Sequence, residues 1–169
     1  MLTLTTLNQL DQDAFVAAIG HVFEHSPWIA AEAWLQRPFA DRTALHAAMV
    51  AVLDAAEEAP QLALIRAHPD LAGRLAQSGQ LTVESAREQA AAGLMTLSAE
   101  EQAQLAAYNT AYQAQFGFPF VICARENKKA AIMAAFPRRL ANQRASEIAT
   151  ALTEIKQIAW FRLCDVVSP

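Results

Sequence analysis

Three polar side chains of different chemistry are spaced to share one face of a short predicted helix. Ser85, Glu88 and Gln89 stand at positions i, i+3 and i+4. Side chains at this spacing are neighbours on a helix surface. A hydroxyl, a carboxylate and an amide on one face could all contact a single polar heterocycle. A solvated helix face is the alternative interpretation of the same spacing.

The imidazole at position 68 is expected to project from a helix junction. His68 precedes Pro69, and the residue before a proline is pushed out of the α region, so the preceding helix should end there. A ring at such a junction can be aimed into a cleft rather than along a regular helix surface. A capping or surface role is the alternative, and it is the commoner one for an isolated histidine before proline.

Arg162 places a permanent positive charge on the apolar side of the predicted C-terminal helix. It takes the next position of an apolar stripe with three- and four-residue steps, formed by Ile148, Leu152, Ile155, Ala159 and Val166. A guanidinium group binds a carboxylate through two parallel hydrogen bonds, so Arg162 could clamp an anionic ligand. The alternative is that it reaches the rim of the fold or pairs with a structural carboxylate such as Asp165.

A short apolar segment offers backbone chemistry instead of side-chain chemistry. Residues 118–123 are almost wholly apolar, begin with Phe118-Pro119 and are too few for a core helix, so we expect a buried extended segment. Backbone groups without a partner strand must find other hydrogen bonds, and a planar ligand with alternating donors and acceptors would supply them. The residues concerned are Phe120, Val121, Ile122, Cys123 and Ala124. Pairing with water or another loop is the alternative.

Helices must carry and orient these groups, and the sequence predicts them along most of the chain. Apolar periodicity and capping residues place helices at about 11–24, 27–35, 41–56, 60–67, 82–92, 98–116 and 128–136, with a last helix beginning near 145. Ser26 is expected to cap the second helix, and Pro137 should kink or break its own helix. The predicted fold class is all-α: a compact single domain over residues 1–169, forming an orthogonal helical bundle with one buried extended segment.

Composition agrees with one helical domain and excludes several partners. The 169 residues are 54% hydrophobic, which is ample for one packed core. The formal net charge is −4 and Lys and Arg are scattered, so we expect no nucleic-acid partner. No apolar run reaches the ~18 residues that span a bilayer, and the N-terminus lacks the pattern of an export signal. We therefore expect no membrane partner.

The cysteines indicate neither a metal site nor a disulfide. Cys123 and Cys164 stand in apolar surroundings and form no CxxC or Cys/His metal spacing. Buried free thiols in a reducing compartment are their expected state. The C-terminal Val167-Ser168-Pro169 is not a peroxisomal signal. We therefore expect no metal and a cytoplasmic location.

Three separated motifs, in this order, resemble the 2-oxo-4-hydroxy-4-carboxy-5-ureidoimidazoline (OHCU) decarboxylases, the enzymes that complete urate breakdown to allantoin. The motifs are His68-Pro69-Asp70-Leu71, Ser85-Ala86-Arg87-Glu88-Gln89 and the segment 116–123 with the sequence FGFPFVIC. Each motif alone is weak, but the resemblance extends over nearly the whole chain, from residues 24–28 to residues 155–163.

The resemblance implies a cofactor-independent carboxy-lyase that converts OHCU to (S)-allantoin, the last step from urate to allantoin in purine catabolism. It implies that His68 and Glu88 manage protons, that Arg162 orients the anionic substrate, and that Ser85 and Gln89 fix its ring and ureido arms. It also implies a homodimer, and substrate contacts from Pro69, Ala86, Arg87 and the segment 120–124. No cofactor is expected, because the conjugated imidazolinone ring of the substrate can itself accept the electrons.

Two other functions are compatible with the sequence. One is a non-catalytic ureide-binding protein with the same cleft, and the retention of both His68 and Glu88 argues against it. The other is an all-helical interaction module in which Trp28, Trp34 and Phe39 form a surface for a partner protein. The core-like spacing of these aromatic residues argues against the module.

Overall fold

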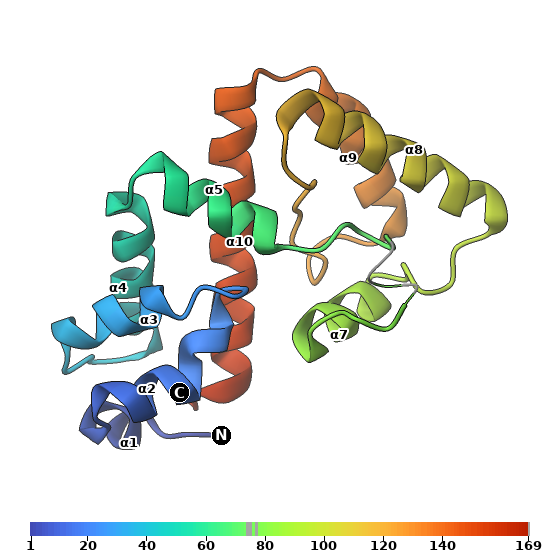
Figure 1. Ribbon diagram of the computed structural model, residues 1–169. Helices are drawn as coiled ribbons and strands as arrows, with labels where there is room; N and C mark the ends of the chain where they lie inside the picture. Colours follow the sequence, from blue (N-terminus) through green and yellow to red (C-terminus); the bar gives the residue numbers. More distant parts are fainter. Residues whose placement is uncertain (74–75, 77, 169) are drawn as a thin grey trace. The chain divides into compact units, whose positions relative to one another are not determined.

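In the computed structural model, which describes residues 1–73, 76 and 78–168, the chain is built from helices and connecting loops (Figure 1). The described part contains no β-strand, and an isolated β-bridge pairs Leu2 with Val167. The predicted all-α fold class is confirmed. Contacts divide the chain into two units, one formed by residues 1–67 and those from 156 onward, the other by residues 68–155. Among the described residues, no helix is long and apolar enough to cross a membrane.

Three α-helices of the first unit begin at side-chain caps. The elements are α1 Leu4–Gln9, α2 Gln12–Ile19, η1 Gly20–Val22, α3 Trp28–Ala33, η2 Trp34–Gln36, α4 Arg42–Ala55 and α5 Glu58–Ala67. Thr3, Asp11 and Asp41 accept first-turn N–H groups of α1, α2 and α4, a contact that stabilises a helix by about 1 kcal/mol.

The predicted cap at Ser26 is wrong by one residue. Pro27 directly precedes α3, and a proline ring supplies no capping hydrogen bond. Ser26 is buried, and its carbonyl accepts the Ile29 N–H at 3.2 Å. The capping rule predicts Pro27 as the first residue of the helix, but Pro27 precedes the helix and Trp28 is its first residue.

The aromatic residues of the first unit pack within it. Phe39 is buried and lies 6.2 Å from the Phe15 ring centroid. The Trp34 indole N–H donates to the Leu10 carbonyl at 3.1 Å, and the Arg37 guanidinium lies 3.9 Å from the Trp34 ring centroid. These contacts give the aromatic residues a structural role, which disfavours the interaction module.

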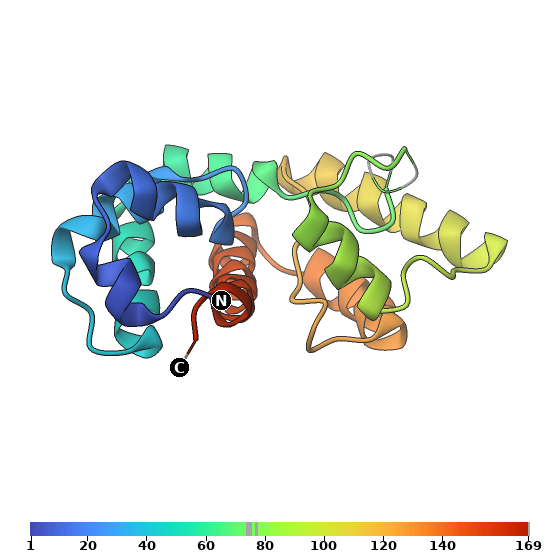
Figure 2. The same ribbon diagram turned by 90° about the horizontal axis from the view of Figure 1, so that it is seen from below.

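The chain ends meet in the first unit. The Leu2 N–H donates to the Val166 carbonyl at 2.8 Å, and the Ser168 N–H donates to the Leu2 carbonyl at 2.9 Å. Figure 2 shows the two ends close together beside the last turns of α10 (Arg144–Val166). The 23-residue helix α10 therefore contributes residues to both units, because its course crosses from residue 155 to residue 156 without a break.

The second unit contains α7 Val83–Ala91, α8 Ala99–Phe116, α9 Lys129–Leu140 and the first part of α10. Thr82 caps α7, and Ser98 with Glu101 forms a capping box at the start of α8. Gly117 ends α8 at φ 77°, a left-handed conformation that glycine adopts without a steric penalty. Helices α8 and α9 pack against each other, with the Tyr108 and Phe136 rings stacked at 5.2 Å.

Of the kink or break predicted at Pro137, the break is wrong, because helix α9 continues through this residue. The proline is exposed and stands in the last turn, where the loss of one backbone donor affects few hydrogen bonds. Arg139, two residues later, is buried and ion-paired with Glu147 of α10 at 2.8 Å. This contact holds the last turn of α9 in place.

The segment 118–124 is buried and non-helical, as predicted. It packs through its phenylalanines: Phe120 stacks on Phe136 with ring centroids 3.8 Å apart, and Tyr112 meets the edges of Phe118 and Phe120. These rings form the core of the second unit and fix the backbone between them.

Candidate functional site

His68 lies immediately after α5, where the proline rule places it. The helix ends at Ala67, and His68 is buried, with 7% of the residue exposed. A tight turn follows, with the Gly73 N–H donating to the Asp70 carbonyl at 3.2 Å. A Cβ at position 73 would lie 2.6 Å from the Asp70 Cβ, so this turn requires glycine. Pro69 is half-buried beside the histidine.

The loop after His68 is held by side chains of two helices. From α8, the Asn109 amide donates to the Leu71 carbonyl at 2.9 Å and the Gln113 amide donates to Asp70 Oδ1 at 2.6 Å. From α7, Gln89 Oε1 accepts the Ala72 N–H at 2.8 Å. Ala72 has φ 47°, a strained conformation for a non-glycine residue. Strain of this kind persists only where the surroundings over-determine the backbone.

The predicted polar face of α7 is its buried face. Ser85, Glu88 and Gln89 are the buried residues of the helix, whereas Ala86 is half-buried and Arg87 is exposed. The face is therefore not solvated, and the i, i+3, i+4 spacing brings a hydroxyl, a carboxylate and an amide together. Helix capping contributes to this placement, because the Thr82 side chain accepts the Ser85 N–H at 3.3 Å.

Hydrogen bonds and an ion pair connect α7 to the other two motifs. Gln89 contacts the loop that starts at His68 through Ala72, as described above. Glu88 Oε1 lies 3.9 Å from the Nε of Arg125, which directly follows the segment 118–124. Gln89 and Glu88 thus contact Ala72 and Arg125, which lie just beyond the other two motifs in the second unit.

The backbone of the segment 118–124 is less free than the sequence suggests. The Val121 carbonyl accepts Arg139 Nη1 at 2.6 Å, and the Cys123 N–H donates to Glu154 Oε2 at 2.8 Å. The Cys123 carbonyl accepts from the Glu126 N–H and the Asn127 amide. Among the described residues, neither the N–H nor the carbonyl of Ile122 has a hydrogen-bond partner. The same holds for the backbone groups of Phe120 and Ala124 and for the Val121 N–H, so the expected lack of partners does not apply to the Val121 carbonyl or to Cys123.

A buried charged network behind this segment was not predicted. Arg139 Nε and Tyr112 Oη both donate to Glu147 Oε2, and the Asn142 amide donates to Glu147 Oε1 at 2.7 Å. The Arg139 guanidinium also lies 4.3 Å from the Phe120 ring centroid. A signal was present in the sequence: Arg139 follows Phe136 by three residues on the apolar stripe of α9, as Arg162 follows Ala159 on that of α10.

Burial changes the proton affinity of two groups near the segment. Desolvation raises the pKa of the Cys123 thiol to about 11, so this thiol is neutral at physiological pH. Desolvation also raises the pKa of Tyr112 above its ordinary value, and the hydrogen bond to the Glu147 carboxylate adds to the shift. Cys123 is buried as expected, whereas Cys164 is only half-buried. Both groups are therefore uncharged at physiological pH.

Arg162 belongs to the first unit and is buried, as its position on the apolar stripe predicts. It is 3% exposed, and its Nη1 donates to Glu24 Oε2 at 2.6 Å. Glu24 is equally buried and follows η1. The alternative interpretation of Arg162 suggested an ion pair with a structural carboxylate such as Asp165. The structure shows an ion pair of this kind with Glu24.

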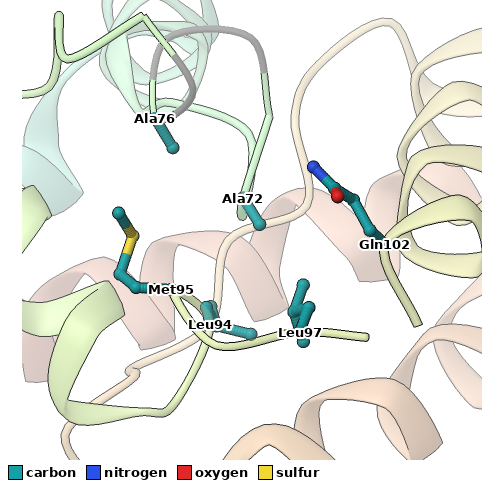
Figure 3. A pocket seen from close by; sticks show the side chains of 6 residues that line it. All are labelled: Ala72, Ala76, Leu94, Met95, Leu97 and Gln102. Carbon is teal, nitrogen blue, oxygen red and sulfur yellow. The ribbon is translucent and has the colours of Figure 1, made fainter. Parts of the chain in front are cut away.

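A cavity of about 120 Å³ lies in the second unit (Figure 3). It is lined by Ala72, Ala76, Leu94, Met95, Leu97 and Gln102. In Figure 3 the amide of Gln102 points toward a space bordered by apolar side chains. None of the predicted site residues is in this lining, although Ala72 is the residue held by Gln89. Among the described residues, no group of three or more His, Cys, Asp or Glu is placed to hold a metal ion.

Comparison with known proteins assigns the chain to a family. A family model described as OHCU decarboxylase matches residues 8–164. Over 166 residues the chain is 43% identical to a human protein named putative OHCU decarboxylase, covering 98% of this chain and 96% of the human one. The chain belongs to the OHCU decarboxylase family. A second member of this family, OHCU decarboxylase of Xenopus laevis, is 39% identical over 165 residues, covering 98% and 94% of the two chains.

A solved structure agrees with this membership of the OHCU decarboxylase family. The crystal structure of an (S)-allantoin synthase matches with a TM-score of 0.76 and 26% identity over 98% of this chain. The match covers 54% of that chain, so this protein corresponds to about half of the longer one.

Proposed function

We propose that this protein is a cofactor-independent carboxy-lyase that decarboxylates OHCU to (S)-allantoin, the last step of the conversion of urate to allantoin. Membership of the OHCU decarboxylase family supports the reaction. One observation from the structure carries the proposal: the polar face of α7 is buried and is tied to the His68 loop and to the turn after the segment 118–124. Contacts to neighbouring segments hold this face in place, and a hydroxyl, a carboxylate and an amide on one face are groups that can recognise a polar heterocycle.

The reaction needs a place for electrons and a source of one proton. Breaking the bond between the ring and its carboxylate releases CO2 and leaves the electron pair on the substrate. The conjugated imidazolinone ring accepts this pair, so no external electron sink is needed. A proton then returns to a ring carbon to give allantoin. The protein has to bind the anion, hold the ring and deliver the proton.

The proposed roles follow from the chemistry of each side chain. His68 and Glu88 manage the protons, and both are buried, which keeps bulk water from competing. Ser85 and Gln89 hold the ring and the ureido arms, with further contacts from Pro69, Ala86 and Arg87. The backbone of residues 120–124 completes the site, and the N–H and carbonyl of Ile122 are candidates within it because neither has a hydrogen-bond partner among the described residues.

Arg162 keeps its proposed role as the ligand of the substrate carboxylate. Its bond to Glu24 uses Nη1, and a guanidinium group has five N–H donors in a planar fork. Glu24 would then orient the fork and balance its charge before substrate binds. Support for this role comes from the resemblance of the chain to the family and from the burial of a charge that water would otherwise solvate.

The remaining proposals concern the state of the protein. We propose that residues 1–169 act as one functional domain, because a single family model matches residues 8–164 across both units. A homodimer and a cytoplasmic location follow from the family resemblance and from two free thiols. Light scattering coupled to gel filtration would test the dimer.

The decisive experiment mixes the protein with freshly generated OHCU and records optical rotation with time. We expect (S)-allantoin to form much faster than in the protein-free control, and the rate to be the same in excess EDTA. Binding without faster turnover would support the non-catalytic ureide-binding protein instead. Loss of activity in EDTA, with recovery on adding a metal, would contradict the cofactor-independent mechanism.

A further inference from the structure

Two carboxylates of α10 each lead to the buried segment 118–124. Glu147 and Glu154 stand seven residues apart, about two turns, so they lie on the same side of the helix. Glu154 Oε2 accepts the Cys123 N–H at 2.8 Å. Glu147 Oε2 accepts Arg139 Nε at 2.8 Å, and Arg139 Nη1 donates to the Val121 carbonyl at 2.6 Å. One glutamate thus anchors the segment directly and the other anchors it through an arginine.

These anchors lie on either side of Ile122 and determine where its peptide groups point. In a planar trans peptide the carbonyl and the N–H point in opposite directions. The Val121 carbonyl points to Arg139, so the Ile122 N–H of the same peptide points away from Arg139. The Cys123 N–H points to Glu154, so the Ile122 carbonyl points away from Glu154. Both groups of Ile122 lack a protein partner among the described residues.

The desolvation cost of burying Glu147 and Arg139 suggests that this ion pair does more than fill the core. Glu147 is fully buried, and replacing a buried ion pair by apolar residues is often neutral or stabilising. This ion pair is also elaborate, because Tyr112 and Asn142 complete the hydrogen bonding of the carboxylate. Such networks hold one backbone conformation in place, since every alternative leaves a charge or a donor unpaired.

We propose that Glu154, and Glu147 acting through Arg139, are positioning residues that present the N–H and the carbonyl of Ile122 to the ureide substrate. The inference rests on the proposed function, since it concerns the same site. A ureido or ring amide group offers one acceptor and one donor, which matches the donor and acceptor of a single residue. The two glutamates do not touch the substrate. Their effect is on the alignment of a backbone hydrogen-bonding pair.

Glu154 gives the sharper test, because its side chain is half-buried and its loss should leave the fold intact. We expect Glu154→Ala to raise the KM for OHCU by about tenfold, which corresponds to about 1.4 kcal/mol, with a much smaller change in kcat. Glu154→Gln should restore the KM, because an amide oxygen still accepts the Cys123 N–H. Thr153→Ala, at an exposed neighbour on the same helix, is the matched control and should behave as the wild type.

A second measurement reports on the Ile122 peptide itself. In protein labelled with ¹⁵N-isoleucine, (S)-allantoin should shift the Ile122 amide resonance of the wild type and of Glu154→Gln, and shift it much less in Glu154→Ala. Assignment follows from the peak that disappears in Ile122→Val. Urea unfolding midpoints of Glu154→Ala and the wild type should agree.

The results separate failure of this inference from failure of the proposed function. A wild type that turns over OHCU while Glu154→Ala keeps a wild-type KM would overturn the positioning role and leave the decarboxylase intact. A KM defect that Gln does not restore, accompanied by a fall in the unfolding midpoint, would also overturn it, because the role would then be structural. A wild type without turnover would refute the proposed function instead.

Discussion

At the scale of single residues, His68 is the clearest case in which local sequence determines a position. The proline after it ends α5 at Ala67, and the turn at Asp70 to Gly73 carries the chain away. The histidine side chain is buried, yet it belongs to no helix. A substitution of His68 should therefore leave the backbone fold intact while removing the imidazole that the reaction needs.

We expect His68→Asn to fold normally and to lose about 10²-fold in kcat/KM, the usual effect of losing a positioned acid or base. The measurement is steady-state decarboxylation of OHCU, with circular dichroism to confirm folding. His21→Asn, at an exposed histidine of η1, is the control. Turnover close to that of the wild type in folded His68→Asn would remove the imidazole from the mechanism.

The buried pair of Arg162 and Glu24 allows stability and catalysis to be separated. Removing one partner leaves a buried charge, so Glu24→Leu and Arg162→Met should each lower the free energy of unfolding by about 3 kcal/mol. The double variant Glu24→Leu/Arg162→Met has no unpaired charge, so it should recover most of this loss in urea titrations. Its activity should nevertheless stay far below that of the wild type, because no guanidinium remains for the substrate carboxylate. A stable, fully active double variant would make Arg162 purely structural.

At the scale of elements, the sequence predicts what depends on local rules. The caps at Asp41, Thr82 and Ser98, the left-handed Gly117 and the polar face of α7 all follow from spacing within a few residues. Such local rules do not predict the side chains that hold the loop after His68. Asn109 and Gln113 hold a loop about forty residues earlier in the chain, and nothing local marks them as different from any solvated amide.

The same limit explains why the anchors of the segment 118–124 were not predicted. The segment is apolar and short, so its burial follows from composition. Its hydrogen-bond partners come from the side chains of Arg139 and Glu154, which are distant in sequence and charged. Charged residues are usually exposed, so a sequence rule places them at the surface. Only tertiary contacts show that Glu147 and Arg139 pair inside the core.

Burial of Cys123 should make the second unit less stable as the pH rises in the alkaline range. The folded-state pKa of the thiol is raised to about 11, so its stabilising contribution is complete below the unfolded-state pKa near 9. That contribution is lost as the pH rises from about 9 to about 11, because the unfolded chain releases this proton more easily. The pKa of Tyr112 is also raised by burial, so this residue adds to the loss of stability once the pH exceeds the ordinary pKa of a tyrosine.

We expect the free energy of unfolding of the wild type to fall by about 1 kcal/mol more than that of Cys123→Ala between pH 8 and pH 10, since one pKa unit corresponds to about 1.4 kcal/mol. Urea titrations in reducing buffer at each pH give the comparison. Cys164→Ala, at a half-buried thiol, should keep the wild-type pH dependence. Identical slopes for Cys123→Ala and the wild type would show that the thiol does not contribute.

At the scale of the whole molecule, the chain divides into two units, and a single family model matches both of them. The match of residues 8–164 includes segments of both units, and α10 contributes to each. Arg162 lies in one unit, whereas His68 and Glu88 lie in the other. The two proposed proton carriers thus belong to the same unit. Stereochemistry is the property of the reaction that tests their role.

Spontaneous decay of OHCU passes through a carbanion-like species that water protonates on either face, so it yields racemic allantoin. The enzyme should give a single enantiomer, (S)-allantoin, because buried groups from the α5 junction and from α7 deliver the proton in a site closed to water. Glu88→Gln preserves the shape of the side chain but removes its ionisable group. Its product should therefore form slowly, with the optical purity falling toward that of the spontaneous reaction.

Chiral chromatography of the allantoin, at several enzyme concentrations, measures this outcome. Glu100→Gln, at an exposed glutamate in the first turn of α8, is the control and should give pure (S)-allantoin at the normal rate. Racemic product from the wild type, at concentrations where catalysis far outruns spontaneous decay, would contradict a closed site with one protonated face. Optically pure product from Glu88→Gln at an undiminished rate would keep that site but exclude Glu88 from proton transfer, leaving His68 as the group that sets the configuration.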